Sequence, residues 1–566
     1  MLGCATTRLE ERLLAAVGLL KQAPLVFEPT RDVPGGGVLC ALPALLANGL
    51  LSHSREHLSM PEGFYPMEAI FLLLGFMALA RVRSMESLRY EPPGEWGKLM
   101  GLDRIPEVKT LRDKVGHLCS QPESLREWST QLAQEWMASD PESAGVFYAD
   151  GHVRVYHGKL TQLPRRYVAR EKLCLRGTTD YWINAMDGQP FFAVTQPVDP
   201  GLIVVLRESV IPRLLEQAPQ TLTPEQLAAN SLAHRFTMVF DRQGYSPEFF
   251  GELKAQRIAI ITYHKFSGED WSKDEFSPHE VTLVHGHTVT LQLAERGTCL
   301  SNGLWVREVR ELGANGHQTS VITTDFISIL IRIAAYMFAR WCQENFLKYM
   351  REHFSLDRLV EYGTVDLPET TRVVNPAHRQ LDKQVRKEVS LLSRQLIQFS
   401  QMALSPTPEP QELESWQQKK GQLTLDITQR RSAVEALKLQ RKQTPRHLEI
   451  KDLPKADQFR CLAPDRKHFL DTIKLIAYRA ETAMAQIVRE PLKRQDDARA
   501  LLRCVYETTV DLTPNLEQKT LTVSLHPLAS QLQDAAVRHL CAELNQTETL
   551  FPRTDLRMVY TIAGSS

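Results

Sequence analysis

Two acidic side chains that follow β-prone apolar runs are the first candidates for chemistry in this sequence. Asp150 follows the run 146–149, and Asp241 follows the run 236–240. Mg²⁺ prefers oxygen ligands and keeps several waters, so a few converging carboxylates can bind it. Two such ions activate a hydroxyl and neutralise a phosphate, which is the chemistry of cutting and joining phosphodiester bonds. Either acid alone is more typical of a solvated strand end.

A third candidate, Glu344, lies in a segment that predicts a long helix from Asp325 to about His353, with Thr324 as its N-cap. At about 100° per residue, four charged residues fall in one narrow stripe, and an apolar stripe lies roughly 120° away. The charged stripe is equally consistent with exposed salt bridges between neighbouring turns. Its members are Arg340, Glu344, Lys348 and Arg351; the apolar stripe contains Ile327, Ile331, Ala334, Phe338 and Cys342.

Around these acids the chain resembles the DDE-type insertion-sequence transposases with a ribonuclease H-like core, in the branch with a Tyr-Arg-Glu-Lys signature. In that family the first Asp lies on the first core strand, which matches Asp150. The second ends the fourth strand in an Asp-Arg-Gly-Tyr-like motif, which resembles 241–245. The Glu lies in an Arg-Trp-x-x-Glu helix, which matches 340–344.

Two positions depart from the family pattern. Tyr336 lies one residue further from Arg340 than the usual spacing, and Arg351 stands where a Lys is usual, with Lys348 as the nearest Lys. An Arg contacts phosphate through a planar fork rather than as a point charge. The resemblance covers 145–355 well and the rest of the chain loosely.

The resemblance implies a metal-dependent DNA transposase with Asp150, Asp241 and Glu344 as catalytic residues and ligands of Mg²⁺, or of Mn²⁺. It implies phosphodiester cleavage and strand transfer at the two ends of a mobile element, and a homodimer on double-stranded DNA. The alternatives are a catalytically inactive transposase-derived DNA-binding protein and a structure-specific ribonuclease H-like nuclease. The first would bind without cutting, and the second would cut without strand transfer.

Basic residues near the acids are candidates for DNA contacts, because Lys and Arg that neutralise phosphates give salt-dependent, sequence-independent affinity. A solvated loop is the alternative for the group that follows Asp150. The candidates are Arg165, Arg166, Arg170, Lys172, Arg242, Arg340, Lys348 and Arg351.

Local patterns predict an α/β fold with a β-rich insertion, between helical N-terminal and α+β C-terminal regions. The resemblance implies that the mixed sheet of this fold is ribonuclease H-like. Val153 to His157 is expected to form a hairpin with the preceding run across Gly151, and Asp187-Gly188 to form a second hairpin turn. The expected regions are 1–130, helical with a candidate helix-turn-helix; 145–355, catalytic, with the insertion at about 265–320; 378–447, a helical hairpin or coiled-coil arm; and 455–566, α+β.

Bulk composition limits the remaining classes. The chain has 566 residues, is 43% hydrophobic, and balances 67 Lys and Arg against 67 Asp and Glu. Zero net charge argues mildly against DNA binding, although the local field of a groove matters more than the sum. Nine scattered cysteines form no Cys-x-x-Cys pair, and the longest apolar run is too short to span a bilayer. We therefore expect a cytoplasmic protein without a membrane segment, and the resemblance implies one of bacterial type that acts at the nucleoid.

Overall fold

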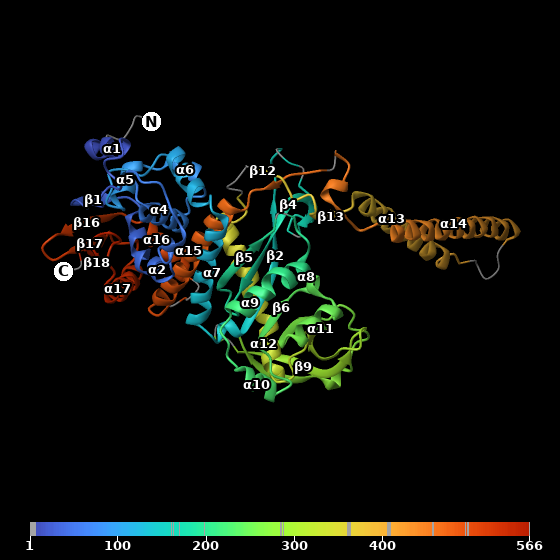
Figure 1. The fold of residues 1–566 in the computed structure, drawn as a ribbon. Coiled ribbons are helices and arrows are strands. Elements are labelled where there is room, and N and C mark those ends of the chain that lie inside the picture. The colour runs from blue at the N-terminus through green and yellow to red at the C-terminus, as the bar shows by residue number, and fades with distance from the viewer. Residues whose placement is uncertain are drawn as a thin grey trace.

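The computed structural model is mixed α/β. The residues that it describes are 7–159, 161, 163–168, 170–196, 198–283, 286, 288–358, 364–403, 409–455, 458–492, 494 and 497–564. Figure 1 shows a body that contains both chain termini, the central strands beside it, and a long helical arm that projects on the opposite side.

A mixed sheet organises the centre of the molecule. Its strands run in the order β3-β4-β2-β6-β7-β11-β10-β9-β8. In addition, β5 pairs with the last part of β4, on the side opposite β2. The strands are β2 (Val146–Val155), β3 (Arg165–Val168), β4 (Leu173–Asn184), β5 (Pro190–Thr195), β6 (Phe236–Phe240), β7 (Ile258–Tyr263), β8 (Ser277–Thr282), β9 (Thr288–Cys299), β10 (Trp305–Leu312) and β11 (Gln318–Thr323).

The direction of each strand follows from its connections. β2 and β4 are antiparallel, as are β4 and β5, whereas β2, β6 and β7 are parallel to one another. The parallel strands are joined through helical crossovers, as parallel pairing requires. These helical elements are α8 (Leu202–Val205), the π-helical turn η4 (Leu206–Val210), α9 (Ile211–Gln217), α10 (Pro224–Ala229), the 3₁₀ turn η5 (Arg242–Gly244) and α11 (Pro247–Ala255).

Both faces of the central strands are buried, and alternate residues face opposite sides. Val146, Tyr148, Val239 and Ile261 pack in one cluster against the helix α12 (Leu330–His353). The intervening residues, such as Phe147 and Met238, join the large core on the other face with residues of α9 and α11. This alternation therefore determines on which face of the sheet the side chain of each residue at a strand end lies.

The insertion between β7 and α12 is antiparallel, through the pairs β8–β9, β9–β10 and β10–β11. A 3₁₀ turn, η6 (Lys273–Glu275), precedes it. Because β11 also pairs with β7, the insertion continues the central sheet. α12 lies across β2, β6 and β7 and reaches β8 and β10.

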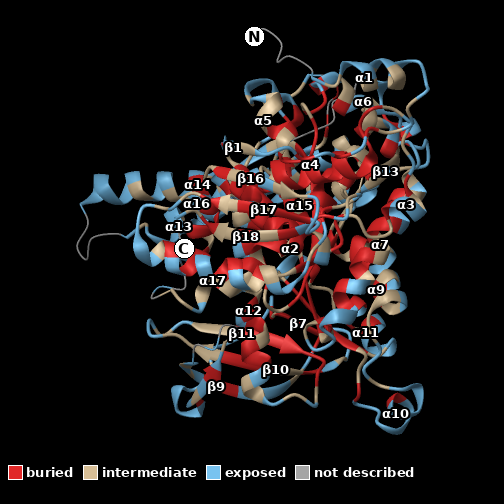
Figure 2. Cartoon of the chain, turned by 90° about the vertical axis from the view of Figure 1, so that its left-hand side faces the viewer, coloured by how far each residue is buried: buried red, intermediate tan, exposed pale blue. Residues whose placement is uncertain are grey.

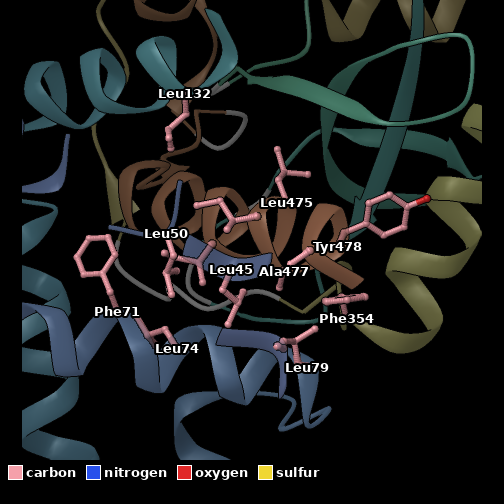
Figure 3. Packing of buried hydrophobic residues seen from close by; sticks show 14 of the residues in the cluster. Leu45, Leu50, Phe71, Leu74, Leu79, Leu132, Phe354, Leu475, Ala477 and Tyr478 are labelled. Carbon is pink, nitrogen blue, oxygen red and sulfur yellow. The ribbon is translucent and has the colours of Figure 1, made fainter. Parts of the chain in front are cut away.

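The N-terminal and C-terminal segments pack together into one body. A four-stranded sheet of order β1-β16-β17-β18 takes its first strand from the N-terminal segment and the other three from the C-terminal segment. The long helix α15 (Asp465–Arg489) packs on α4 (Met67–Leu79), which is buried on nearly all sides. Figure 3 shows this contact, with Leu475 and Ala477 of α15 above Leu74 and Leu79 of α4. In Figure 2 these central elements are mostly red, the colour of buried residues.

The other elements of this body are mostly helical. They are α1 (Leu9–Ala16), β1 (Thr30–Val33), η1 (Gly36–Ala41), α2 (Leu42–Ala47), α3 (Ser54–His57), η2 (Met85–Tyr90), α5 (Pro93–Lys98), α6 (Val108–Leu118), α7 (Pro122–Ser139), η3 (Ser143–Gly145), α16 (Ala498–Glu507), β16 (Val510–Asn515), β17 (Thr520–Leu525), α17 (Gln531–Gln546) and β18 (Arg557–Ile562).

The projecting arm is an antiparallel helical hairpin of α13 (Pro376–Ser400) and α14 (Pro410–Gln443). Ion pairs between the two helices follow this antiparallel arrangement: Arg441 contacts Asp382 near the base, and Arg430 contacts Glu388 further out. Short elements connect the arm to the body: β12 (Thr364–Val365) with β15 (Cys461–Leu462), β13 (Arg372–Val374) with β14 (His447–Glu449), and the turn η7 (Ile450–Asp452).

Two local expectations were wrong. The hairpin across Gly151 does not form, because β2 runs straight through Gly151 and pairs with β4 as far as Val155. The long helix begins at Leu330 rather than at Asp325, because the Asp325 carboxylate accepts the backbone N–H groups of Ile327 and Ser328 in a turn before it. The expected apolar stripe is therefore displaced: Ile327 and Phe338 are exposed. The turn at Gly188 between β4 and β5 is as expected.

Candidate functional site

Asp150 and Asp241 lie side by side on parallel strands. The last residue pair of β2 and β6 is Ala149 with Phe240, so each acid is the next residue on its strand. Neighbouring strands lie about 4.8 Å apart. By alternation from Tyr148 and Val239, both carboxyl groups are on the face that α12 covers. Asp150 is within β2 rather than at its end, but at the point where β6 stops beside it.

Tyr263 extends this row onto the third parallel strand. Val239 pairs with Ile261, so Tyr263, two residues further along β7, is level with Asp241 and on the same face. The Tyr263 ring lies below two cations, with the guanidinium carbons of Arg242 and Arg340 at 5.5 and 5.7 Å from its centroid. Tyr263 was not among the residues predicted from sequence, although its position at the end of a buried run is the same signal that marked both acids.

A buried amide fixes α12 over this row. Gln343, 1% exposed, donates from Nε2 to the carbonyl oxygens of Tyr148 at 3.1 Å and Trp182 at 2.9 Å, and to Oδ1 of Asn184 at 2.8 Å. The helix is thereby held, at the residue before Glu344, to β2 and β4 next to Asp150. A Cβ on Gly188 would lie 2.8 Å from the Cys342 carbonyl oxygen, so the β4–β5 turn also abuts α12 at this point.

Arg340 and Glu344 form an ion pair on α12, one helical turn apart, beside the two strand acids. Arg340 is largely buried and its charge acts on both acids, lowering the pKa of Asp150 and of Asp241, while the charge of Glu344 raises them. Glu344 is about half exposed, with 45% of its side chain accessible. The four groups therefore form one electrostatic unit.

Negative charge dominates that unit. Burial, followed by the charge of Asp241, raises the pKa of Asp150 from 3.8 to about 6. Burial also raises the pKa of Asp241, against a hydrogen bond from the Gln243 backbone N–H. A divalent cation would relieve such repulsion, because it favours the charged form of each carboxylate. The donor set of three carboxylates is therefore one that suits Mg²⁺.

The three carboxyl groups are close but not fully convergent. Among the residues that the structure describes, one group of three potential ligands has donor atoms all within 4.8 Å of one another, namely Asp32, Asp511 and His526 in the terminal body. Asp150, Asp241 and Glu344 are not such a group, and Glu344 is paired with Arg340.

The remaining candidate DNA contacts on and near α12 differ in their availability. Lys348 is exposed, and Arg242 is exposed over Tyr263. Arg351 is half-buried. Burial raises the pKa of Asp357, but the contact with His152 and, to a smaller extent, the charges of Arg170 and Arg351 lower it below its ordinary value.

The basic group that follows Asp150 in the sequence is distributed along β3 and its turn. Arg166 and Arg170 make internal contacts: Arg166 with Asp199, and Arg170 with the Val153 carbonyl oxygen and with Asp357. Arg165 is exposed and bonds the Cys174 carbonyl oxygen. Lys172 is exposed in the β3–β4 turn with φ of 52°.

In the N-terminal region where a helix-turn-helix was expected, some of the cations are paired with acids. Lys98 contacts Glu95 at 2.9 Å, and Arg112 contacts Glu86 at 2.8 Å. Burial lowers the pKa of Lys114. The helix-turn-helix stays a prediction.

Comparison with known proteins gives the family. The model of the Transposase_29 family, described as transposase protein, matches residues 1–564. A search of curated proteins finds no match. Within the described residues, no helix combines the length and the hydropathy needed to cross a bilayer. Since the family model spans nearly the whole sequence, this chain belongs to the transposase family.

Proposed function

We propose that this transposase is of the DDE type, with a ribonuclease H-like core and with Asp150, Asp241 and Glu344 as the residues that hold divalent metal. The observation that carries the proposal is the row of two acids on adjoining parallel strands beneath a helix that presents a third. Setting aside the short β3, β6 is the fourth strand of the core that begins at β2. The acids thus follow the order first strand, fourth strand and helix, as the resemblance implies.

The proposed reaction is hydrolysis of a phosphodiester bond at each end of a mobile element, followed by attack of the freed 3′-hydroxyl on target DNA. Mg²⁺, or Mn²⁺, would activate the attacking hydroxyl and neutralise charge on the phosphate. Asp150 and Asp241 would hold both ions, and Glu344 would hold the second. Two ends call for two copies of the chain, so we also propose a homodimer on double-stranded DNA.

The residues around the acids would position them and the DNA. Gln343 would keep Glu344 in register with the strand acids through its three hydrogen bonds. Arg340 neutralises part of the acid cluster, and release from Glu344 would free its planar fork to bind a phosphate bidentately. Lys348 and Arg242 are exposed beside the row and would contact the DNA backbone.

The test is a cleavage and joining assay with the full chain, Mg²⁺, and a plasmid that carries the two flanks of its own coding region. Asp241→Asn should abolish cleavage and leave DNA binding within about threefold of the native protein. Asp270→Asn, at an exposed position before the insertion, is the matched control and should cut normally. Cleavage by Asp241→Asn at the native rate contradicts the proposal. Binding without cutting by the native protein supports an inactive derivative, and cutting without joining supports a nuclease.

A further inference from the structure

The helical arm concentrates positive charge in a chain that is neutral as a whole. Residues 376–447 contain 13 Lys and Arg against 7 Asp and Glu, a net charge of +6, whereas the rest of the chain has 54 against 60. Figures 1 and 2 show that the arm extends clear of the rest of the molecule and that its surface is mostly exposed. This charge is therefore presented to the surroundings rather than to the fold.

On α13 the cations gather along one side. At about 100° per residue they fall within roughly 100° of arc. The buried Val385, which packs towards α14, lies roughly 150° from the centre of that arc. We call this set of exposed residues the α13 basic stripe: Arg379, Lys383, Arg386, Lys387 and Arg394.

The acids of α13 do not neutralise the stripe. The helix has two acids, and both are engaged by α14: Asp382 by Arg441 and Glu388 by Arg430. Asp382 also pairs with Arg386 of the stripe, whose side chain stays 81% exposed. Among the described residues, the other four stripe cations have no carboxylate at ion-pair distance. An uncompensated row of this kind is suited to a polyanion.

The base of the arm adds to the same field. Burial lowers the pKa of His447, and the charges of Arg446, Arg372 and His378 lower it further. Cations thus crowd where β13 and β14 join the arm, next to the first stripe residue, Arg379.

The base of the arm also lies at the end of the central sheet that carries the candidate acids. Val198, which follows β5, packs against the cluster of Val373, Ile450 and Leu453 at the arm's base. Thr161, in the connection that follows β2, donates to the Arg460 carbonyl oxygen at 2.6 Å. Both contacts come from the carboxyl-terminal side of β2, beyond Asp150.

We propose that the α13 basic stripe binds the phosphate backbone of duplex DNA, independently of base sequence and away from the candidate acids. The stripe spans 16 residues, Arg379 to Arg394, which is about 22 Å of helix, and a duplex presents a phosphate charge about every 1.7 Å of its axis. Several simultaneous phosphate contacts therefore fit its length. The proposal rests on the charge distribution of the arm and not on the assignment of the metal-binding acids.

The experiment measures how DNA affinity depends on salt, for the full chain and two unrelated 40-base-pair duplexes in buffer without divalent ions. A variant with all five stripe cations changed to Gln should bind both duplexes more weakly. Its slope of log affinity against log salt should be less steep by about 3 to 4.5, since each lost phosphate contact removes about 0.9. The matched control changes five exposed cations of the terminal body, Lys21, Arg31, Arg503, Lys519 and Arg557, to Gln and should keep the native slope.

A gain-of-charge variant keeps the proposal testable if the five simultaneous substitutions disturb the helix. Ser390 is exposed at the centre of the stripe, and Ser390→Lys should steepen the slope by about 0.9. Slopes of the stripe variant and of Ser390→Lys equal to the native slope overturn the proposal. A stripe variant that changes only the sedimentation of the DNA-free protein also overturns it, in favour of contact with an acidic surface of a second copy. An equal loss of slope in the control variant overturns it too.

Discussion

The raised pKa of Asp150 makes a stability prediction with a defined sign. The pKa of this carboxyl rises from 3.8 to about 6, so the folded protein holds the proton more tightly than the unfolded chain. The penalty for ionising it in the fold is absent below about pH 4, grows between pH 4 and 6, and is complete above pH 6. At 1.36 kcal/mol for each pKa unit, it reaches about 3 kcal/mol.

Asp150→Asn removes this penalty and keeps an oxygen that can accept the Gly151 backbone N–H, which donates to Asp150 at 2.8 Å. The variant should therefore be more stable than the native protein at pH 7.5, by up to about 3 kcal/mol, and equally stable at pH 4. For an unfolding unit of 150–250 residues, 1 kcal/mol corresponds to about 2–4 °C in Tm. Thermal unfolding by circular dichroism at the two pH values, without divalent ions, measures the difference.

Mg²⁺ should act in the opposite direction, by stabilising the native protein more than the Asp150→Asn variant. A cation that binds the native acids stabilises the folded state by mass action, and Asn offers it a weaker ligand. Added Mg²⁺ should raise the Tm of the native protein more than that of Asp150→Asn, with Asp270→Asn as the control that follows the native protein. An Asp150→Asn variant that is no more stable than the native protein at pH 7.5, or that gains as much at pH 4, refutes the reasoning.

Two further predictions concern buried polar contacts, those of Gln343 on α12 and those of Glu481 on α15. Gln343→Leu leaves two buried carbonyl oxygens, of Tyr148 and Trp182, without their donor and should cost about 2–4 kcal/mol of unfolding free energy, measured by urea titration; a cost under 0.5 kcal/mol would mean that the amide does not fix the helix. Glu481→Gln leaves Arg81 and Arg499 without their buried carboxylate partner and should cost about 3–5 kcal/mol, whereas Glu507→Gln, at an exposed position, should be neutral. Equal Tm values for these two Glu variants would contradict the second prediction.

The candidate acids could be found in the sequence because the signal was local. An apolar run that ends in an acid fixes both the strand and the level of the carboxyl group, as at 236–241. The turn at Asp187-Gly188 was equally local, since Gly adopts the positive φ, here 87°, that the turn needs. The extension of β2 beyond Asp150 was not found, because Gly151 permits either a turn or a continued strand, and the pairing with β4 decides.

Other features depend on contacts between distant segments. β1 has four residues and pairs with β16, nearly 480 positions later, so no local pattern indicated that the terminal segments share a sheet. Gln343 resembles any polar residue on a helix until the carbonyl oxygens of β2 and β4 are placed beneath it. The start of α12 was misplaced because Thr324 is a good N-cap by type, and only the bonds that the Asp325 carboxylate accepts from the following turn exclude the helix there.

The central claim is that Asp150, Asp241 and Glu344 hold divalent metal together. Bound Fe²⁺ with ascorbate and peroxide cuts a polypeptide next to the ion, and the fragments of the full chain can be sized and sequenced. We expect three cuts, adjacent to residues 150, 241 and 344, that excess Mg²⁺ suppresses and that Asp241→Asn removes together. Cuts confined to the neighbourhood of Asp32, Asp511 and His526, or cuts at only one of the three acids, contradict the account.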